Sequence, residues 1–227
     1  MIIECPVCQQ RVVEYLPFGT SSLQPPRPNA QCPHCKSLER HRLITLYFRN
    51  CTNLFYEKIR MFHVAPEPEI STLLKKTLNI DYITGDLDQE HAMFKIDLTD
   101  IKFPDNFFDV VYASHVLELI TDDLKAMREI HRVLKPSGWA ILQVPINGKI
   151  TVEDPTITDP KERERVFGQF DHVRQYGHDG VYKNRLETAG FNVKIDQYVR
   201  SLYPDLIKKY GLMQSEDIYY CTKTHNY

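Results

Sequence analysis

Two pairs of cysteines near the start of the chain have the spacing of metal ligands. The pairs are Cys5-Pro-Val-Cys8 and Cys32-Pro-His-Cys35. Each pair can present two thiolates to one ion, and two such pairs complete a tetrahedral zinc site. Disulfides or unrelated thiols are the alternative. Because four thiolates leave no coordination position for water, we expect this zinc to be structural rather than catalytic. The predicted ligands are Cys5, Cys8, Cys32 and Cys35.

Polar side chains also lie where apolar stretches of the remaining chain end. These side chains are Asp86, Asp97 and the pair Ser114-His115. In open parallel sheets, ligands bind beyond the carboxyl ends of the strands, and a carboxylate about 20 residues after the first strand is placed to bind a ribose diol. This position favours Asp86 as a ribose ligand. The alternative is that Asp86 caps the turn that follows it.

His115 is the candidate catalytic residue. The pKa of an unperturbed imidazole suits proton removal near neutral pH, which is the chemistry of a general base. The alternative is a histidine at the start of a helix that only packs against a ligand.

The elements that must position these residues alternate between strand and helix from about residue 58. Expected strands are 59–64, 82–84, 94–96, 108–113, 139–144, 191–198 and 217–222. Expected helices are 67–78, 121–135, capped by Thr121, and 181–189. Such alternation predicts an α/β fold with a parallel sheet covered by helices.

The domain organisation follows from where apolar material is found. Residues 1–36 contain the cysteine pairs and a proline-rich linker at 19–29. These residues include too few apolar side chains to form a hydrophobic core, so we expect the bound metal to supply the folding free energy. We expect a linking helix over residues 37–54, capped by Ser37. We interpret Arg40-His41-Arg42 as part of its solvent-exposed face. Residues 55–227 form the expected main domain.

Composition narrows the class of protein. The chain has 227 residues and a formal net charge of -2, which argues against a protein wrapped in nucleic acid. No apolar run approaches membrane-spanning length, so we expect no membrane partner. Six cysteines without a secretion-signal pattern predict a reducing, cytoplasmic location.

The main domain resembles the class I S-adenosylmethionine (SAM)-dependent methyltransferases, in particular the type-11-like group. The motifs that carry the resemblance are Ile96-Asp97-Leu98, Phe103-Pro104-Asp105, Phe107-Phe108-Asp109-Val110-Val111, His115-Val116-Leu117-Glu118 and Arg132-Val133-Leu134-Lys135-Pro136-Ser137-Gly138. The chain is also similar to a subgroup that joins such a domain to cysteine pairs like these. The resemblance implies a Rossmann-like, doubly wound, mostly parallel sheet of seven strands, with a small N-terminal zinc-binding module.

The resemblance also implies SAM as the cofactor and a role for each site residue. Asp86 would hold the ribose hydroxyls, and Asp97 and Leu98 would contact the adenine. Ser114 and His115 would lie beside the sulfonium and the incoming acceptor. The loop after the first strand would carry the methionine part of SAM, and Glu67 would accept from its ammonium. The candidates in and before that loop are His63, Ala65 and Glu67.

That loop departs from the family pattern. The chain has Ala65-Pro66-Glu67-Pro68-Glu69 where a glycine-rich turn is usual. Glycine lets the backbone approach a ligand closely, and each proline removes a backbone donor.

Substrate contacts are expected from the loop after the fifth strand, because loops beyond strand ends carry specificity. The candidates are His172, Arg174 and Tyr176, with Arg174 suited to an anionic group. The alternative is a loop pinned by packing and salt bridges.

The sequence therefore predicts an enzyme, a SAM-dependent methyltransferase with a structural zinc site and an unidentified acceptor. A small molecule is the preferred acceptor class, and a protein side chain or RNA stays open. One alternative is a catalytically degenerate methyltransferase fold whose zinc module recruits a partner. The other is a methyltransferase of the ribosomal RNA type.

Overall fold

A computed structural model describes residues 3–19 and 25–223, and the chain divides into two compact units. The first unit takes the chain up to residue 59, then 67–81 and 196–217. The second unit takes 60–66, 82–195 and the chain from 218. Each unit is therefore assembled from segments that lie far apart in the sequence.

Within the described residues, the first unit contains two pairs of short antiparallel strands and four helices. Strand β1 (Ile3–Glu4) pairs antiparallel with β2 (Arg11–Val12), and β3 (Leu16–Phe18) pairs antiparallel with β4 (Arg27–Gln31). The helices are α1 (Glu39–Cys51), α2 (Pro68–Leu74), α6 (Tyr198–Ser201) and α7 (Pro204–Tyr210). Part of the expected linker at 19–29 is thus strand β4, and its residues 20–24 lie outside the described residues.

Helix α1 differs from its prediction in its start and in its buried face. Leu38 rather than Ser37 is the N-cap, and the Leu38 amide donates to Nδ1 of His41 at 3.1 Å. The interpretation of residues 40–42 as a solvated face is wrong, because His41 and Arg42 are buried.

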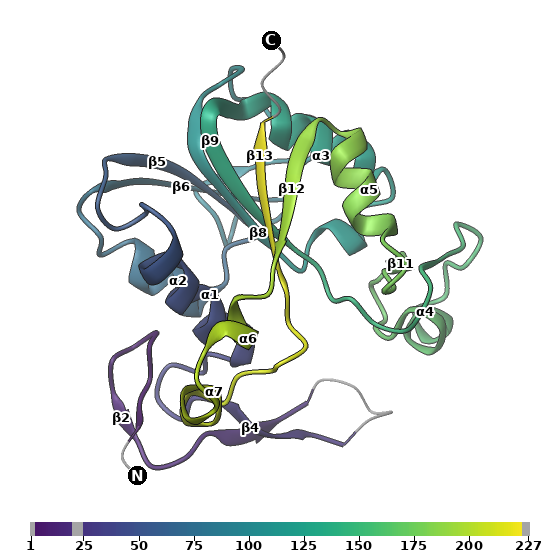
Figure 1. Cartoon of the computed structure of the whole chain (residues 1–227). Coiled ribbons are helices and arrows are strands. Elements are labelled where there is room, and N and C mark those ends of the chain that lie inside the picture. Colours follow the sequence, from purple (N-terminus) through teal and green to yellow (C-terminus); the bar gives the residue numbers. More distant parts are fainter. Residues whose placement is uncertain (1–2, 20–24, 224–227) are drawn as a thin grey trace. The chain divides into compact units, whose positions relative to one another are not determined.

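The second unit is built on a seven-stranded, mostly parallel sheet within the described residues (Figure 1). The strand order is β12-β13-β9-β8-β5-β6-β7. The strands are β5 (Ile59–Val64), β6 (Ile80–Asp86), β7 (Phe94–Lys95), β8 (Phe108–Ser114), β9 (Leu134–Gln143), β12 (Phe191–Asp196) and β13 (Ile218–Lys223). The pairs β5–β8, β8–β9 and β6–β7 are parallel, whereas β13 runs antiparallel to β9. The predicted Rossmann-like fold is confirmed. Strands β5 and β6 start in the first unit.

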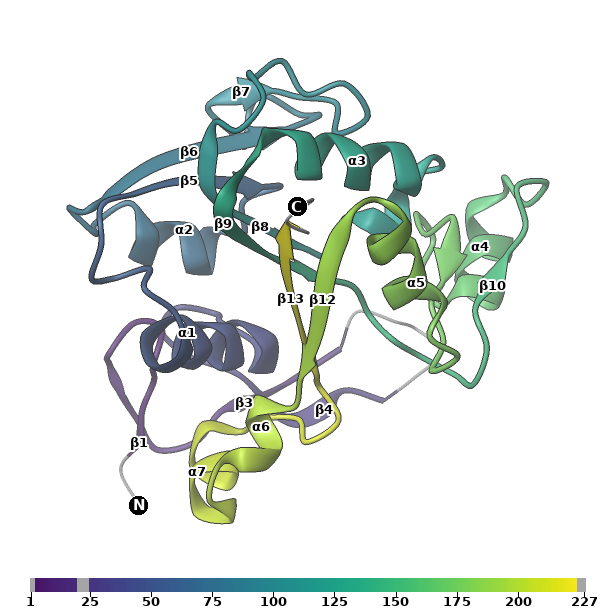
Figure 2. The ribbon, with the colours of Figure 1, turned by 45° about the horizontal axis from the view of Figure 1, so that its top comes forward.

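Helices α3 (Asp123–Val133) and α5 (Val181–Thr188) lie side by side (Figure 2). Both supply apolar side chains to the same core as the sheet. Helix α3 starts later than predicted, because Asp122 rather than Thr121 caps it, accepting from the Lys125 amide. It ends at Val133, where β9 begins. The predicted helix at 67–78 is shorter, since α2 ends at Leu74.

The core of the second unit lies where α3 and α5 meet the central strands. Phe62 of β5 and Phe108 of β8 are fully buried and stack with ring centroids 5.0 Å apart. Burying a phenylalanine side chain contributes about 1.5–3 kcal/mol, so such rings fix the strands whose ends carry the polar residues.

Four short elements complete the second unit within the described residues. The 3-10 turn η1 (Leu117–Leu119) follows β8, and α4 (Pro160–Phe167) packs on a two-stranded sheet formed by β10 (Val152–Glu153) and β11 (Arg174–Gln175). Among residues 3–19 and 25–223, no helix has both the length and the apolar character needed to cross a membrane.

Candidate functional site

The four cysteine sulfurs in the first unit form one cluster. Their Sγ atoms all lie within 4.8 Å of one another, with Cys5 and Cys35 at 3.9 Å and Cys8 and Cys32 at 4.0 Å. A zinc ion about 2.3 Å from each sulfur in a tetrahedron would hold the sulfurs about 3.8 Å apart. A disulfide needs about 2.05 Å, and the cysteines are free. The donor set and its spacing fit a zinc ion.

The backbone around the two cysteine pairs repeats one pattern. In each pair, the residue after the second cysteine donates its amide to the carbonyl of the first, at 2.8 Å for Gln9 and 3.0 Å for Lys36. Gln9 and Lys36 both have left-handed backbone, with φ of 61° and 63°. Two matching turns thus present the cysteines to one point.

Ser37 contacts two sulfurs of this cluster through its hydroxyl. Its buried hydroxyl lies 3.1 Å from Sγ of Cys35 and 3.5 Å from Sγ of Cys5. The hydrogen bond between Cys35 and Cys5 lowers the pKa of Cys5 to about 4 and raises the pKa of Cys35. Cys5 is therefore favoured as a thiolate, whereas burial raises the pKa of Cys8 to about 11, so a bound metal ion would displace the proton of such a thiol.

In the second unit, the carboxyl ends of the central strands meet at one edge of the sheet. The Ala65 amide, just after β5, donates to the carbonyl of Gly85 in β6 at 2.8 Å. Ser114, the last residue of β8, pairs with Gln143, and the His115 amide donates to the Gln143 carbonyl at 2.9 Å. The predicted residues Ala65, Ser114 and His115 therefore lie along one edge.

Two of these residues have unusual backbone conformations. Ala65 and His115 are in the left-handed region, with φ of 45° and 58°. This conformation costs a residue with a side chain about 1–2 kcal/mol, and such strain is concentrated at functional sites. The loop after β5 has thus kept a turn that suits glycine although it contains none.

Asp86 and Asp97 both cap turns. Oδ1 of Asp86 accepts from the Asp88 amide at 2.9 Å, and Oδ1 of Asp97 accepts from the amide and hydroxyl of Thr99 at 2.8 and 2.9 Å. The bonds from Thr99 lower the pKa of Asp97. Leu98 is buried in the hydrophobic core. Asp86 therefore caps the turn that follows it, which was the alternative to a ribose contact. This hydrogen bond uses Oδ1, one of its two carboxylate oxygens.

The predicted cofactor residue His63 is fully buried inside the sheet. Its Nδ1 lies 2.7 Å from the hydroxyl of Tyr82 in β6, and its ring packs against Tyr112 of β8 with centroids 4.9 Å apart. These contacts assign His63 to the packing of three adjacent strands rather than to the edge.

Glu67, which was expected to bind the cofactor ammonium, belongs to the first unit. Its Oε1 accepts from Nε and Nη2 of Arg40 at 3.1 and 2.8 Å, and lies 2.7 Å from Nε2 of His41. Burial by itself would raise the pKa of Glu67, but His41 and Arg40 hold it well below the usual range. Arg40 and His41 of α1 thus stabilise the buried Glu67 carboxylate without a bound ligand.

His115 and His172 both approach the same carboxylate oxygen of Glu118, a residue of η1. Oε1 of Glu118 is 3.7 Å from Nδ1 of His115 and 4.0 Å from Nε2 of His172. The Glu118 side chain is 1% exposed, whereas 35% of the His115 side chain is exposed. Sequence reasoning missed Glu118 as a site residue. Its position three residues after His115 was the signal that could have found it.

Arg174 and Tyr176 are held in a buried polar network. The Arg174 guanidinium, 1% exposed, donates to the carbonyls of Leu117 at 3.0 Å and Thr121 at 2.8 Å, and to Glu153 at 2.7 Å. This arrangement corrects the expectation that Arg174 faces a substrate, because all these partners belong to the protein.

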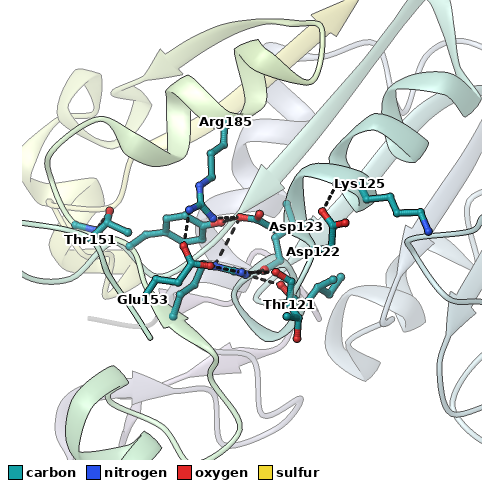
Figure 3. A network of polar contacts seen from close by, with 12 residues as sticks. Thr121, Asp122, Asp123, Lys125, Thr151, Glu153 and Arg185 are labelled. Carbon is teal, nitrogen blue, oxygen red and sulfur yellow. Dashed lines mark hydrogen bonds and ion pairs between the residues drawn. The ribbon is translucent and has the colours of Figure 1, made fainter. Parts of the chain in front are cut away.

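Asp123 collects the other members of this network, and Figure 3 shows it between Arg185 and the Thr121 turn. Its Oδ2 accepts from the Tyr176 hydroxyl and from Nη1 of Arg185 at 2.7 Å. Burial and the Asp123 charge raise the pKa of Tyr176. The loop is therefore pinned by salt bridges, as the alternative interpretation had it.

Comparison with known proteins agrees with this geometry. Residues 61–142 match the family model described as a methyltransferase domain. The matched stretch runs from β5 to β9 and includes the strand ends that carry Asp86 and His115. Residues 61–142 therefore resemble a methyltransferase domain, as the sequence motifs predicted.

Two curated relatives and one solved structure resemble the chain. The mitochondrial arginine-hydroxylase NDUFAF5 of Danio rerio is 33% identical over 111 residues, which is 48% of this chain and 34% of that protein. The ubiquinone/menaquinone biosynthesis C-methyltransferase UbiE of Vibrio campbellii is 49% identical over 39 residues, 17% of this chain and 15% of that protein. The matches thus span about a third or less of these relatives.

A SAM-dependent methyltransferase from Archaeoglobus fulgidus has the same fold. Its structure aligns with a TM-score of 0.55 at 17% identity, and covers 81% of this chain and 94% of that chain.

Proposed function

We propose that this chain is a SAM-dependent methyltransferase that acts on an unidentified acceptor, with a small molecule as the preferred class. The observation that carries the proposal is the edge where Ala65, Asp86 and Ser114-His115 follow adjacent strands within a methyltransferase domain. In this type of sheet, that edge is where the ligand binds.

The cofactor would be held by residues of this edge. Asp86 accepts from the ribose hydroxyls, and the stretch at Asp97 and Leu98 contacts the adenine. The left-handed turn at Ala65 brings the backbone close to the methionine part, and Ser114 lies beside the sulfonium. When bound, SAM supplies an electrophilic methyl group on sulfur. The protein then aligns the acceptor with that methyl and excludes water, which are large contributions to such a transfer.

In this proposal the zinc ion stabilises the fold and takes no part in the transfer reaction. The four cysteines belong to the first compact unit, whereas Ala65, Asp86, Ser114 and His115 belong to the second. Cys5, Cys8, Cys32 and Cys35 close the coordination sphere, so the ion contributes folding free energy and no open position. Because thiolates persist under reducing conditions, a reducing compartment such as the cytoplasm is part of the proposal.

The test is a calorimetric titration of the purified, zinc-loaded chain with SAM and with its demethylated product, S-adenosylhomocysteine. We expect micromolar dissociation constants for both, with transfer of labelled methyl to an acceptor found by screening. Folded protein that binds neither ligand would rule out the proposal.

A second candidate is a binding protein with a degenerate methyltransferase fold. Pro66 and Pro68 favour it, because they remove two backbone donors from the loop after β5. The zinc module would then recruit a protein partner. The same titration separates the two candidates, since the degenerate protein binds neither form of the cofactor.

A further inference from the structure

A buried carboxylate between two histidines lies directly beyond strand β8. Oε1 of Glu118 faces Nδ1 of His115 at 3.7 Å and Nε2 of His172 at 4.0 Å. His115 comes from the strand end and His172 from a loop more than 50 residues later. Burying a carboxylate costs free energy unless charged or hydrogen-bonding groups face it, and the two imidazoles are groups of this kind.

The surrounding backbone holds these groups in place. The Val173 amide donates to the Glu118 carbonyl at 3.1 Å, and Arg174 binds the carbonyls of Leu117 and Ile120 on either side of it, at 3.0 and 2.5 Å. The η1 turn and the segment that carries His172 are therefore one structural piece. The pinned Arg174 thus fixes the carboxylate relative to both imidazoles.

The orientation of His115 defines its chemistry. The nitrogen that faces Glu118 is Nδ1, so the carboxylate favours the neutral tautomer that carries its proton on Nδ1. The Nε2 lone pair is then left as the basic site on a ring that is 35% exposed. The separation of 3.7 Å is long for a hydrogen bond, but such bonds are often loose before the substrate is bound.

We propose that Glu118 is a positioning residue that holds His115 as the proton acceptor of methyl transfer, for acceptors whose attacking atom carries a proton. The lone pair of an acceptor hydroxyl forms the new bond to the methyl carbon, while the carbon–sulfur bond breaks and its electrons stay on sulfur. The hydroxyl proton passes to Nε2 of His115. This inference rests on the proposed function.

The charged and titratable groups around this pair belong to three elements. His172, next to Asp171, and Tyr182 of α5 face Glu118 together with His115. Burial lowers the pKa of His172 and raises that of Tyr182, so both are neutral near pH 7. Of the groups named here, the Glu118 carboxylate is the one whose ionised form would act on His115.

The experiment follows His115 by NMR and needs no acceptor. The full chain, labelled with 15N at histidine and saturated with S-adenosylhomocysteine, is titrated between pH 5 and 9, with His115→Gln used to assign the resonance. We expect Nε2 to be the unprotonated nitrogen of the neutral ring. In Glu118→Gln the pKa of His115 should fall by about half a unit or more, because an opposite charge is lost. The control Glu162→Gln, on the exposed side of α4, should leave it unchanged.

A second titration tests where His115 lies relative to the methyl group. A SAM analogue with a primary amine on carbon in place of the methylsulfonium should shift the His115 nitrogens, beyond any change that S-adenosylhomocysteine causes. Because this measurement uses the wild-type chain, it tests whether His115 is the proton acceptor even if Glu118→Gln does not fold.

The outcomes separate this inference from the proposed function. If neither cofactor form binds, the proposed function fails and the inference fails with it. If both bind but His115 does not respond to the amine analogue, or stays protonated up to pH 9, only the base role is overturned. An unchanged pKa of His115 in Glu118→Gln overturns the positioning role.

Discussion

Arg42 of α1 donates from Nη1 to the carbonyl oxygen of Ser37 at 2.9 Å, and this bond joins the helix to the turn of the second cysteine pair. The same guanidinium donates to the carbonyls of Ala30 at 2.9 Å, Tyr210 at 2.6 Å and Gly211 at 3.0 Å. Arg42 is fully buried. One side chain therefore joins two of the chain segments of the first unit, the one that carries the cysteine pairs and the one that carries α7.

We expect Arg42→Lys to lower the free energy of unfolding by about 2–4 kcal/mol, because an ammonium cannot reach carbonyls on several sides and some would be left without donors. The measurement is chemical denaturation followed by circular dichroism. Arg49→Lys, on the last turn of the same helix, is the matched control and should change stability by less than about 0.5 kcal/mol. Equal effects of the two substitutions would contradict this role of Arg42.

Cys32→Ser should lower the bound zinc below one equivalent and lower the melting temperature, since three thiolates bind the ion less tightly. Metal content is read by mass spectrometry of the purified protein. Cys51→Ser is the control, because Cys51 is exposed and outside the cluster. Full zinc content in Cys32→Ser would show that the four sulfurs do not form one site.

Asp86→Ala should weaken SAM binding at least about tenfold, or about 1.4 kcal/mol, through loss of hydrogen bonds to the ribose. Calorimetry gives the dissociation constant. Asp100→Ala removes an exposed carboxylate paired with Lys102 and should leave affinity unchanged. Unaltered affinity in Asp86→Ala would reject the ribose role and leave only turn capping.

Ala65→Gly should raise the free energy of unfolding by up to about 1 kcal/mol, because glycine adopts the left-handed backbone at Ala65 without steric cost. Ala126→Gly, inside α3, should act in the opposite direction, since glycine destabilises a helix interior. Denaturant midpoints compare the two. A loss of stability in both variants would contradict a strained turn after β5.

The ion cluster of Glu67 should make stability depend on pH. The pKa of Glu67 is lower in the folded chain than its ordinary value of 4.5, so the unfolded chain takes up the proton first as the pH falls. The contribution of Glu67 is therefore complete above about pH 5 and is lost progressively below about pH 4. The melting-temperature difference between wild type and Glu67→Gln should shrink over that range. Glu14→Gln, exposed in the same unit, should show a small and constant difference.

The sequence by itself determined the features that depend on local pattern. Alternating strands and helices predicted the sheet, and the motifs between Ile96 and Gly138 predicted the resemblance to a methyltransferase domain, because both reflect residues close together in the chain. The cysteine spacing likewise predicted the cluster that the four sulfurs form.

Only the tertiary structure decided which polar side chains are used within the protein. The sequence suggested a solvated face for Arg40 and a cofactor contact for Glu67, yet these two residues pair because α1 and α2 pack together. Glu118 meets His172 only because the later loop folds back over η1. Sequence periodicity states which face of an element is apolar, but not which distant element covers it, and that choice sets the burial and partners of every charge.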